Sequence, residues 1–257
     1  MPLLEMDRVT MAFGGLRAVE DFTLRLEPGE LVGLIGPNGA GKTTVFNVIT
    51  GVYRPTAGRI RFQGQDIAGR PPADITRLGI ARTFQNIRLF ADMTVLENIL
   101  VAYNFRVAYG FWRAIFRGPS FHAEERRLRD EAMELLRLVH LHDKAGYPAG
   151  SLPYGEQRRL EIARALATRP RLLLLDEPAA GMNPAEGQEL MEFIRWVRSR
   201  FDLTILLIEH HMPIVMGVCE RVLVLDFGRV IAEGKPAEIQ NNPRVIEAYL
   251  GEEEAAG

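Results

Sequence analysis

Cysteine, long apolar runs and an excess of either charge are all scarce in this sequence of 257 residues. The one cysteine, Cys219, excludes a disulfide framework and is typical of a protein from a reducing compartment. No apolar run reaches the roughly 18 residues of a membrane-spanning helix, because polar side chains interrupt the nearest run at 93–116. Glu5 and Asp7 lie near the start of the sequence, which does not fit a secretory signal peptide. We therefore expect a cytosolic protein.

The charge balance argues against nucleic acid as a partner. Lys and Arg number 31 and Asp and Glu 33, which gives a formal net charge of −2 and no broad cationic surface. Hydrophobic residues make up 47% and charged residues 25%, and these proportions exclude an intrinsically disordered chain. At ~150 residues per domain, the length fits one large α/β domain with an attached subdomain.

Apolar and alternating segments predict an α/β fold. Residues 31–35 form a short apolar run before a glycine-rich turn, and residues 58–64 alternate in the manner of a strand. Helical spacing dominates between residues 74 and 142. A helical segment separates two fully apolar runs, 172–175 and 203–208, which is typical of parallel strands buried on both faces.

A glycine-rich segment that begins at residue 36 carries the strongest chemical signal. Residues 36–43 match the phosphate-binding loop pattern G-x-x-x-x-G-K-[ST], and a predicted strand and helix flank them as this motif requires. Backbone N–H groups of such a loop surround the β-phosphate at a positive helix end. We predict that Lys42 reaches the β- and γ-phosphates and that the Thr43 hydroxyl binds Mg²⁺. The predicted nucleotide-binding residues of the loop are Gly36, Pro37, Asn38, Gly39, Ala40, Gly41, Lys42, Thr43 and Thr44.

An apolar strand that ends in Asp176 and Glu177 supplies the second half of the predicted site. Ligands bind at the carboxyl ends of strands in open α/β sheets, so Asp176 is placed to hold Mg²⁺ through water. Glu177 then serves as a base or orients the attacking water. Without the phosphate loop, the same pair would be equally consistent with two solvated carboxylates at a strand end.

The order of the motifs along the chain carries a family resemblance. After the phosphate loop come Thr-Phe-Gln at 83–85, Leu-Pro-Tyr-Gly-Glu-Gln-Arg-Arg-Leu at 152–160, Asp-Glu at 176–177 and Glu-His at 209–210. This order resembles the nucleotide-binding subunit of an ABC transporter over essentially the whole chain. The resemblance implies a P-loop NTPase core of the RecA-like type with a small antiparallel β subdomain and an inserted helical subdomain.

The same resemblance implies boundaries within a single ABC ATPase domain of residues 1–257. Residues 1–84 and 158–250 are expected to form the β subdomain and the core. Residues 85–157 are expected to form the helical subdomain, with an aromatic and basic insertion at 105–121. Residues 251–257 are expected to form a frayed tail.

Three residues acquire catalytic roles from the resemblance. Gln85 resembles the glutamine that senses Mg²⁺ and the γ-phosphate, Glu177 acts on water, and His210 resembles the switch histidine that contacts the γ-phosphate. The alternative for Gln85 is a surface glutamine. His211 competes with His210, but His210 directly follows the apolar strand and Glu209, so we favour it. The predicted metal ligands are Thr43, Gln85 and Asp176.

Two further nucleotide contacts follow from the resemblance. Phe13 resembles the aromatic residue that stacks on adenine, with packing inside the small β subdomain as the alternative. Residues 152–156 occupy the signature position, which binds the nucleotide of the opposite subunit. The predicted contacts there are Pro153, Tyr154, Gly155 and Glu156.

The signature departs from the usual Leu-Ser-Gly-Gly-Gln. Pro153 stands at the serine position and offers neither a hydroxyl nor an N–H group. Glu156 replaces the final glutamine and adds a negative charge near a triphosphate. We expect Ser151 to cap the following helix, and we expect a heterodimer with unequal sites, a homodimer being the alternative.

Four segments narrow the resemblance to one of the two ATPases of branched-chain amino acid importers: 82–90, 105–121, the Leu-Pro-Tyr-Gly of the signature and 242–251. It implies ATP and Mg²⁺ as cofactors and a peripheral location on the cytoplasmic face of the inner membrane. The implied partners are membrane permease subunits, a second ATPase subunit and, indirectly, a substrate-binding protein. The insertion at 105–121 fits docking on a permease or on lipid headgroups, with internal packing as the alternative.

Two other functions compete with this interpretation. The first is the ATPase of a lipopolysaccharide exporter or of another ABC transporter, because the ATPase subunit itself does not touch the substrate. The second is an ABC ATPase of DNA repair or translation that is not coupled to transport. The single phosphate loop and the absence of sustained heptads between Lys42 and Tyr154 argue against the second.

Overall fold

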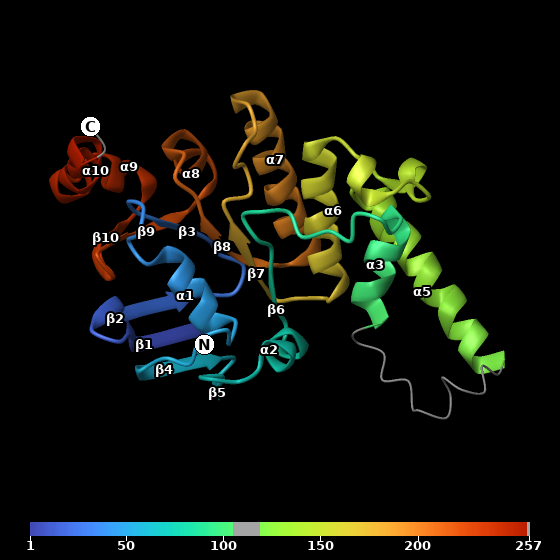
Figure 1. Cartoon of the computed structure of the whole chain (residues 1–257), viewed down its shortest axis with the longest axis horizontal. Coiled ribbons are helices and arrows are strands. Elements are labelled where there is room, and N and C mark those ends of the chain that lie inside the picture. Colours follow the sequence, from blue (N-terminus) through green and yellow to red (C-terminus); the bar gives the residue numbers. More distant parts are fainter. Residues whose placement is uncertain (105–118, 256–257) are drawn as a thin grey trace. The chain divides into compact units, whose positions relative to one another are not determined.

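A six-stranded sheet organises the first of two compact units, which contains Met1–Gln85 and Arg171–Gly257 (Figure 1). The computed structural model describes residues 1–104 and 119–255. The strand order is β10-β9-β3-β8-β7-β6, with every neighbouring pair parallel except β9 and β10. The bounds are β3 (Leu31–Ile35), β6 (Ile80–Arg82), β7 (Leu172–Asp176), β8 (Thr204–Ile208), β9 (Arg221–Asp226) and β10 (Arg229–Gly234).

The fully apolar runs of the sequence form the centre of this sheet. Every residue of β3, β7 and β8 is buried, as the runs at 31–35, 172–175 and 203–208 predict. The edge strand β6 was not predicted, because it is only three residues long and lies in a segment with helical spacing. Its pairing with β7 defines it as a strand.

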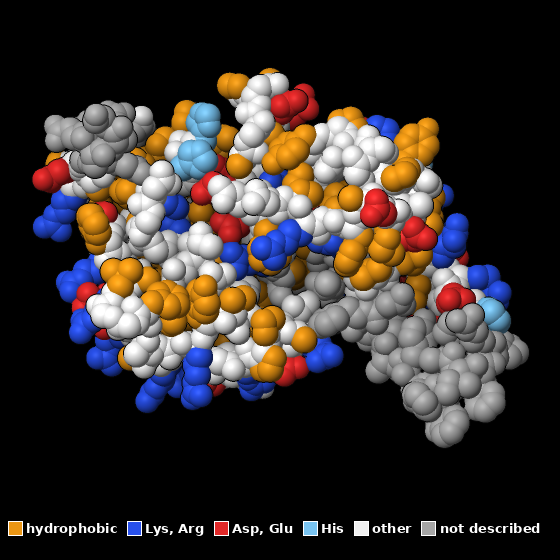
Figure 2. Space-filling view, in the orientation of Figure 1, with side chains coloured by type: hydrophobic (Ala, Val, Ile, Leu, Met, Phe, Trp, Pro, Cys, Tyr) orange, Lys and Arg blue, Asp and Glu red, His pale blue; other side chains and the backbone are white. Residues whose placement is uncertain are grey.

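A four-stranded antiparallel sheet lies in the same unit, in the order β2-β1-β4-β5. Its bounds are β1 (Leu4–Phe13), β2 (Leu16–Leu26), β4 (Ala57–Phe62) and β5 (Gln65–Asp66). One face carries buried residues such as Met6 and Ile60, which join α1 (Lys42–Ile49) and the larger sheet in one hydrophobic core. The outer face is charged: Arg25 and Arg61 flank Glu5 across the strands, and Figure 2 shows blue side chains along this sheet.

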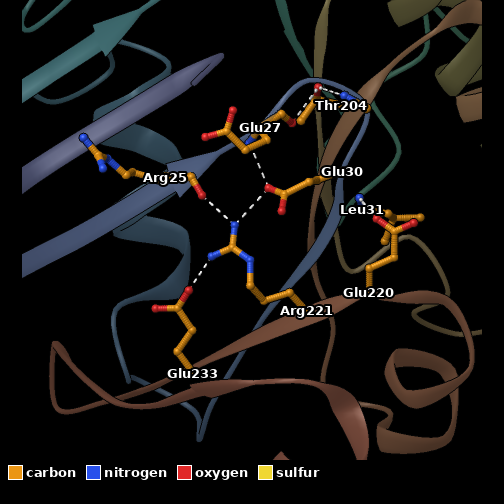
Figure 3. A network of polar contacts seen from close by, with 9 residues as sticks. Arg25, Glu27, Glu30, Leu31, Thr204, Glu220, Arg221 and Glu233 are labelled. Carbon is orange, nitrogen blue, oxygen red and sulfur yellow. Dashed lines mark hydrogen bonds and ion pairs between the residues drawn. The ribbon is translucent and has the colours of Figure 1, made fainter. Parts of the chain in front are cut away.

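Arg221 ties the two sheets together at one edge (Figure 3). Its guanidinium donates to the carbonyl oxygen of Arg25 at 2.5 Å, to Glu30 Oε2 at 2.9 Å and to Glu233. Arg25 belongs to β2, Glu30 precedes β3 and Glu233 belongs to β10, so one side chain connects three chain segments. Nearby, the Thr204 hydroxyl accepts from the N–H of Gly29 at 2.9 Å.

The remaining helices of the first unit are α2 (Pro72–Leu78), α7 (Pro184–Phe201), α8 (Met212–Val218), α9 (Pro236–Gln240) and α10 (Pro243–Ala255). Asn183 and Glu186 form a capping box at the start of α7, with both bonds at 3.0 Å. α8 approaches β3 closely, since a Cβ on Gly33 would lie 3.0 Å from Cys219 Sγ. The expected tail at 251–257 begins as a continuation of α10 to Ala255.

The second unit, Asn86–Pro170, is helical. It contains α3 (Val95–Asn104), α5 (Pro119–Leu138), α6 (Tyr154–Ala167) and two 3₁₀ turns, His142–Lys144 and Ala149–Ser151. All of α6 groups with this unit, whereas we assigned it to the core from residue 158 onward. Residues 105–118 of the predicted insertion lie outside the described residues. Among the described helices, none has the length and apolar character needed to span a bilayer.

Candidate active site

The glycine-rich loop connects β3 to α1 with two backbone conformations that demand glycine. Gly36 has φ +148°, and a Cβ there would lie 1.9 Å from the carbonyl oxygen of Leu225. Gly41 has φ +103°, and its Cβ would lie 2.3 Å from the carbonyl oxygen of Ala18. The strands behind the loop therefore leave no room for a side chain at either position.

Lys42 points back into this loop. Its ammonium donates to the carbonyl oxygens of Gly36 at 2.6 Å and Pro37 at 2.8 Å, and the residue is only 7% exposed. The positive charge therefore lies inside the loop, at the N-terminal end of α1, where a helix favours anions. Thr43 follows it and is exposed on the first turn of the helix.

Two side chains from the β6 segment hold the two carboxylates at the end of β7. Arg82 Nη2 donates to Asp176 Oδ2 at 2.7 Å, and Gln85 Nε2 donates to Glu177 Oε2 at 2.7 Å. Asp176, Gln85 and Glu177 were predicted as site residues, and Arg82 was not. Its only sequence signal was its position three residues before Gln85, which means little until β6 is known to pair with β7.

Glu177 and His210 also approach each other. His210 Nδ1 lies 3.6 Å from Glu177 Oε2, so the structure brings the three predicted catalytic residues Gln85, Glu177 and His210 together. Glu177 has φ +44°, a left-handed conformation that costs energy for a residue with a Cβ. The pale blue histidine side chains are exposed near α8 in Figure 2, and His211 is the N-cap residue of α8.

A buried carboxylate beside this group was not predicted. Glu209 is 1% exposed and accepts from the N–H of Ala179 at 3.0 Å, so it fixes the segment that follows Glu177. Burial raises the pKa of Glu209, and the hydrogen bond from Ala179 opposes that rise. Burial likewise raises the pKa of the Cys219 thiol to about 12, which makes it an inert core residue.

Phe13 combines features of both interpretations given to it. Its ring meets Tyr53 edge to face at 5.1 Å between centroids, which is packing within the first unit. The side chain nevertheless remains 42% exposed, so a ring face is accessible to a planar ligand.

The signature residues lie at the start of α6 in the second unit. Pro153 is the N-cap residue and Tyr154 begins the helix. The prediction that Ser151 caps this helix is wrong, because Ser151 belongs to a 3₁₀ turn and donates to the carbonyl oxygen of Pro148 at 2.7 Å. Lys144 Nζ lies 2.5 Å from both carboxylate oxygens of Glu156, so an ammonium offsets the charge of Glu156.

The predicted metal ligands suit a hard cation. Thr43, Asp176 and Gln85 offer a hydroxyl, a carboxylate and an amide, which are oxygen ligands of the kind that Mg²⁺ prefers. The described residues contain no cluster of three His, Cys, Asp or Glu that could hold a metal ion. This donor set therefore fits a cation that takes most of its ligands from phosphate and water.

Comparison with known protein families decides the identity of this arrangement. A family model described as "ABC transporter" matches residues 19–180, which include the phosphate loop, the signature and Asp176. The chain belongs to the ABC transporter family. It is an ATP-binding cassette with ATPase activity, which confirms the predicted family, fold class and enzyme class. A second model, described as "Branched-chain amino acid ATP-binding cassette transporter", matches residues 229–255.

Individual relatives of the cassette agree with this assignment. The high-affinity branched-chain amino acid transport ATP-binding protein BraF of Pseudomonas aeruginosa is 49% identical over 251 residues, which cover 98% of each chain. The corresponding protein LivG of Escherichia coli K12 gives the same identity and coverage. The crystal structure of the ADP conformation of MJ1267, an ATP-binding cassette of an ABC transporter, superposes with a TM-score of 0.85 at 31% identity. That match covers 98% of this cassette and 99% of MJ1267.

Proposed function

We propose that this cassette hydrolyses ATP to drive the import of branched-chain amino acids by an ABC transporter. The grouping of Gln85, Glu177 and His210 carries the catalytic part of this proposal. The branched-chain amino acid family match at 229–255 and the 49% identity to BraF and LivG support the substrate class.

Catalysis follows from what each side chain can do with a bound nucleotide. The loop N–H groups and Lys42 would hold the phosphates, and Lys42 would exchange the carbonyl oxygens of Gly36 and Pro37 for phosphate oxygens. Glu177 would accept a proton from the attacking water or orient it. Gln85 holds that carboxylate through a hydrogen bond, and His210 lies beside it at 3.6 Å.

Mg²⁺ would supply charge neutralisation at the β- and γ-phosphates. Thr43, Asp176 and Gln85 are the residues that would hold it, directly or through water, and the hydrogen bond from Gln85 links this set to Glu177.

The partners would be permease subunits and a second ATPase subunit, with this cassette peripheral on the cytoplasmic face of the membrane. Residues 86–90 directly follow Gln85 and offer a docking surface. Phe90 is 48% exposed, and the buried Asn98 holds both its N–H and its carbonyl oxygen, at 3.0 and 3.1 Å. Aromatic side chains such as Phe are enriched at the cores of protein–protein interfaces, which supports Phe90 as a docking residue.

Reconstitution tests the proposal. The cassette is co-purified with its membrane partners, the partners are identified, and the complex is placed in vesicles with ATP on the cassette side and the implied substrate-binding protein on the other side. We expect ATP-dependent movement of radiolabelled leucine, isoleucine or valine. ATP hydrolysis that moves none of these amino acids would contradict the substrate class and leave the ATPase role standing.

A further inference from the structure

Arg82 forms a buried fork beside the predicted metal site. Its Nη2 donates to Asp176 Oδ2 at 2.7 Å, and its Nη1 donates to Asn47 Oδ1 at 2.7 Å. The side chains of Arg82 and Asp176 are each 6% exposed. The guanidinium therefore spans from the first helix after the phosphate loop to the last residue of β7.

Two aromatic rings lie close to this guanidinium. Its Cζ lies 5.4 Å from the centroid of the Phe46 ring and 4.9 Å from that of Phe84. Cation–π contacts of this length stabilise a desolvated cation and restrict its orientation. Because Phe46 belongs to α1 and Phe84 follows β6, aromatic rings from two different chain segments contact the cation.

We propose that Arg82 is a positioning residue that serves as the counter-ion of Asp176 when no metal is bound. This proposal rests on the proposed function of Asp176 as a Mg²⁺ residue. A carboxylate with 5% exposure is costly unless it is paired and hydrogen-bonded. Arg82 meets that need at Oδ2, so the ionised carboxylate is held in one orientation before the cation arrives.

The positive charge of Arg82 affects how strongly Asp176 attracts Mg²⁺. Arg82 and the cation share one carboxylate, so Arg82 weakens the attraction between Asp176 and Mg²⁺. Without Arg82, the metal becomes the main counter-charge of Asp176. Mg²⁺ should then add more to nucleotide affinity and to thermal stability than it does in the wild type.

The test compares Arg82→Met with wild type in the full chain, by thermal melting and by binding of a fluorescent ADP analogue. Each measurement is made in EDTA and in millimolar Mg²⁺. We expect Arg82→Met to melt roughly 6–20 °C lower than wild type in EDTA, since an unpaired buried carboxylate remains. We expect Mg²⁺ to raise ADP affinity by at least about tenfold more in Arg82→Met than in wild type, because opposite charges at such sites contribute more than one factor of ten.

Matched variants separate positioning from ordinary packing. Asn47→Ala removes the other arm of the fork and should leave the Mg²⁺ effect on ADP affinity at the wild-type value. Arg82→Lys keeps the charge and should move the Mg²⁺ effect back toward wild type. Arg82→Gln keeps a donor without charge, and it carries the test if Arg82→Met does not fold.

Two results would overturn the inference. One is an equal Mg²⁺ effect on ADP affinity in wild type, Arg82→Met and Arg82→Gln. The other is an enlarged Mg²⁺ effect in Asn47→Ala that equals the effect in the Arg82 variants. If wild-type ADP affinity does not respond to Mg²⁺ at all, the metal site of the proposed function fails. The stability in EDTA still reports on the Arg82–Asp176 pair in that case, because Arg82→Met with Asp176→Asn should regain the lost melting temperature.

Discussion

Gln85 Nε2 donates to Glu177 Oε2 at 2.7 Å, and this bond links the end of the β6 segment to the carboxylate after β7. The chain leaves the first unit at Gln85, and Asn86 is the first residue of the helical unit. The side chain that holds Glu177 therefore lies directly at the connection to the helical unit. His210 at 3.6 Å gives Glu177 a second neighbour that does not depend on this connection.

Replacement of the carboxylate tests its role in hydrolysis. Glu177→Gln should lower the ATP turnover rate by roughly 10²–10⁴-fold, the range for a positioned acid or base, and should leave ATP binding intact. Turnover is measured by phosphate release and binding by a fluorescent ATP analogue. Lys42→Ala is the contrasting variant, because it should weaken binding itself. A Glu177→Gln cassette with near wild-type turnover would remove Glu177 from the mechanism.

The docking surface is tested by a charge placed on Phe90. Phe90→Asp should abolish stimulation of ATPase activity by the permease while ATP binding persists, because the ring is 48% exposed and a carboxylate opposes an apolar contact. Leu89→Asp should do the same with some loss of stability, since Leu89 is half-buried. Val101→Asp is the control, as Val101 is a 38% exposed apolar residue on α3. Stimulation that survives both changes at 89 and 90 would move the docking surface elsewhere, with the insertion as the next candidate.

The sequence predicted those parts of the structure that depend on nearby residues. The strands β3, β7 and β8 were found because each is short and mostly apolar. The fork of Arg82 was missed because its partner Asp176 is 94 positions away and the pairing requires β6. The cap expected from Ser151 was wrong because a 3₁₀ turn uses the hydroxyl first. Contacts fixed by tertiary structure leave no periodic signal in a single sequence.

A buried ion pair in the helical unit predicts that removing both of its charges destabilises the fold less than removing one. Arg158 and Glu161 are 0% and 2% exposed and bond at 2.7 Å, and Glu161 Oε1 also accepts from the N–H of Arg88 at 3.2 Å. Arg158→Met should cost about 3–5 kcal/mol of unfolding free energy, because Glu161 stays buried without that partner. Adding Glu161→Leu should recover part of the loss and leave a deficit of about 1–3 kcal/mol from the Arg88 N–H. Urea unfolding measures both, and a double variant no more stable than Arg158→Met would refute the charge argument.

Glu209 predicts a stability change with pH. Its folded-state pKa is raised by burial, so the folded protein binds more protons than the unfolded chain above the usual glutamate range. Stability from this group is therefore lost as the pH rises through that range. Glu209→Gln removes the cost and keeps an acceptor for the N–H of Ala179. The stability of the variant relative to wild type should therefore be greater at pH 8 than at pH 4.5, as urea unfolding measures. A gain that is equal at both pH values would contradict the assignment.

The altered signature predicts two ATP sites of unequal activity in the proposed heterodimer. The ammonium of Lys144 pairs with Glu156, so it offsets the negative charge that Glu156 brings to the signature. The remaining departure is Pro153, which lacks a hydroxyl and an N–H at the N-cap position.

In enzymes generally, loss of one hydrogen-bond donor to the transition state lowers the rate by about 10²–10³-fold. Because the helix N-terminus and the Gly155 N–H remain as donors, the rate loss caused by Pro153 should be smaller. The site built on Lys42 and Glu177 and completed by the partner's signature should be the faster one. Pro153→Ser should raise turnover at the slower site by less than about 10²-fold. Lys144→Met should lower the affinity of the slower site for ATP, because the substitution leaves Glu156 without an ammonium partner. Turnover and ATP affinity are measured in the assembled complex, once with the partner's own catalytic glutamate intact and once with that glutamate disabled. Equal transport losses from the two glutamate variants, together with a silent Pro153→Ser, would show that the altered signature has no catalytic consequence.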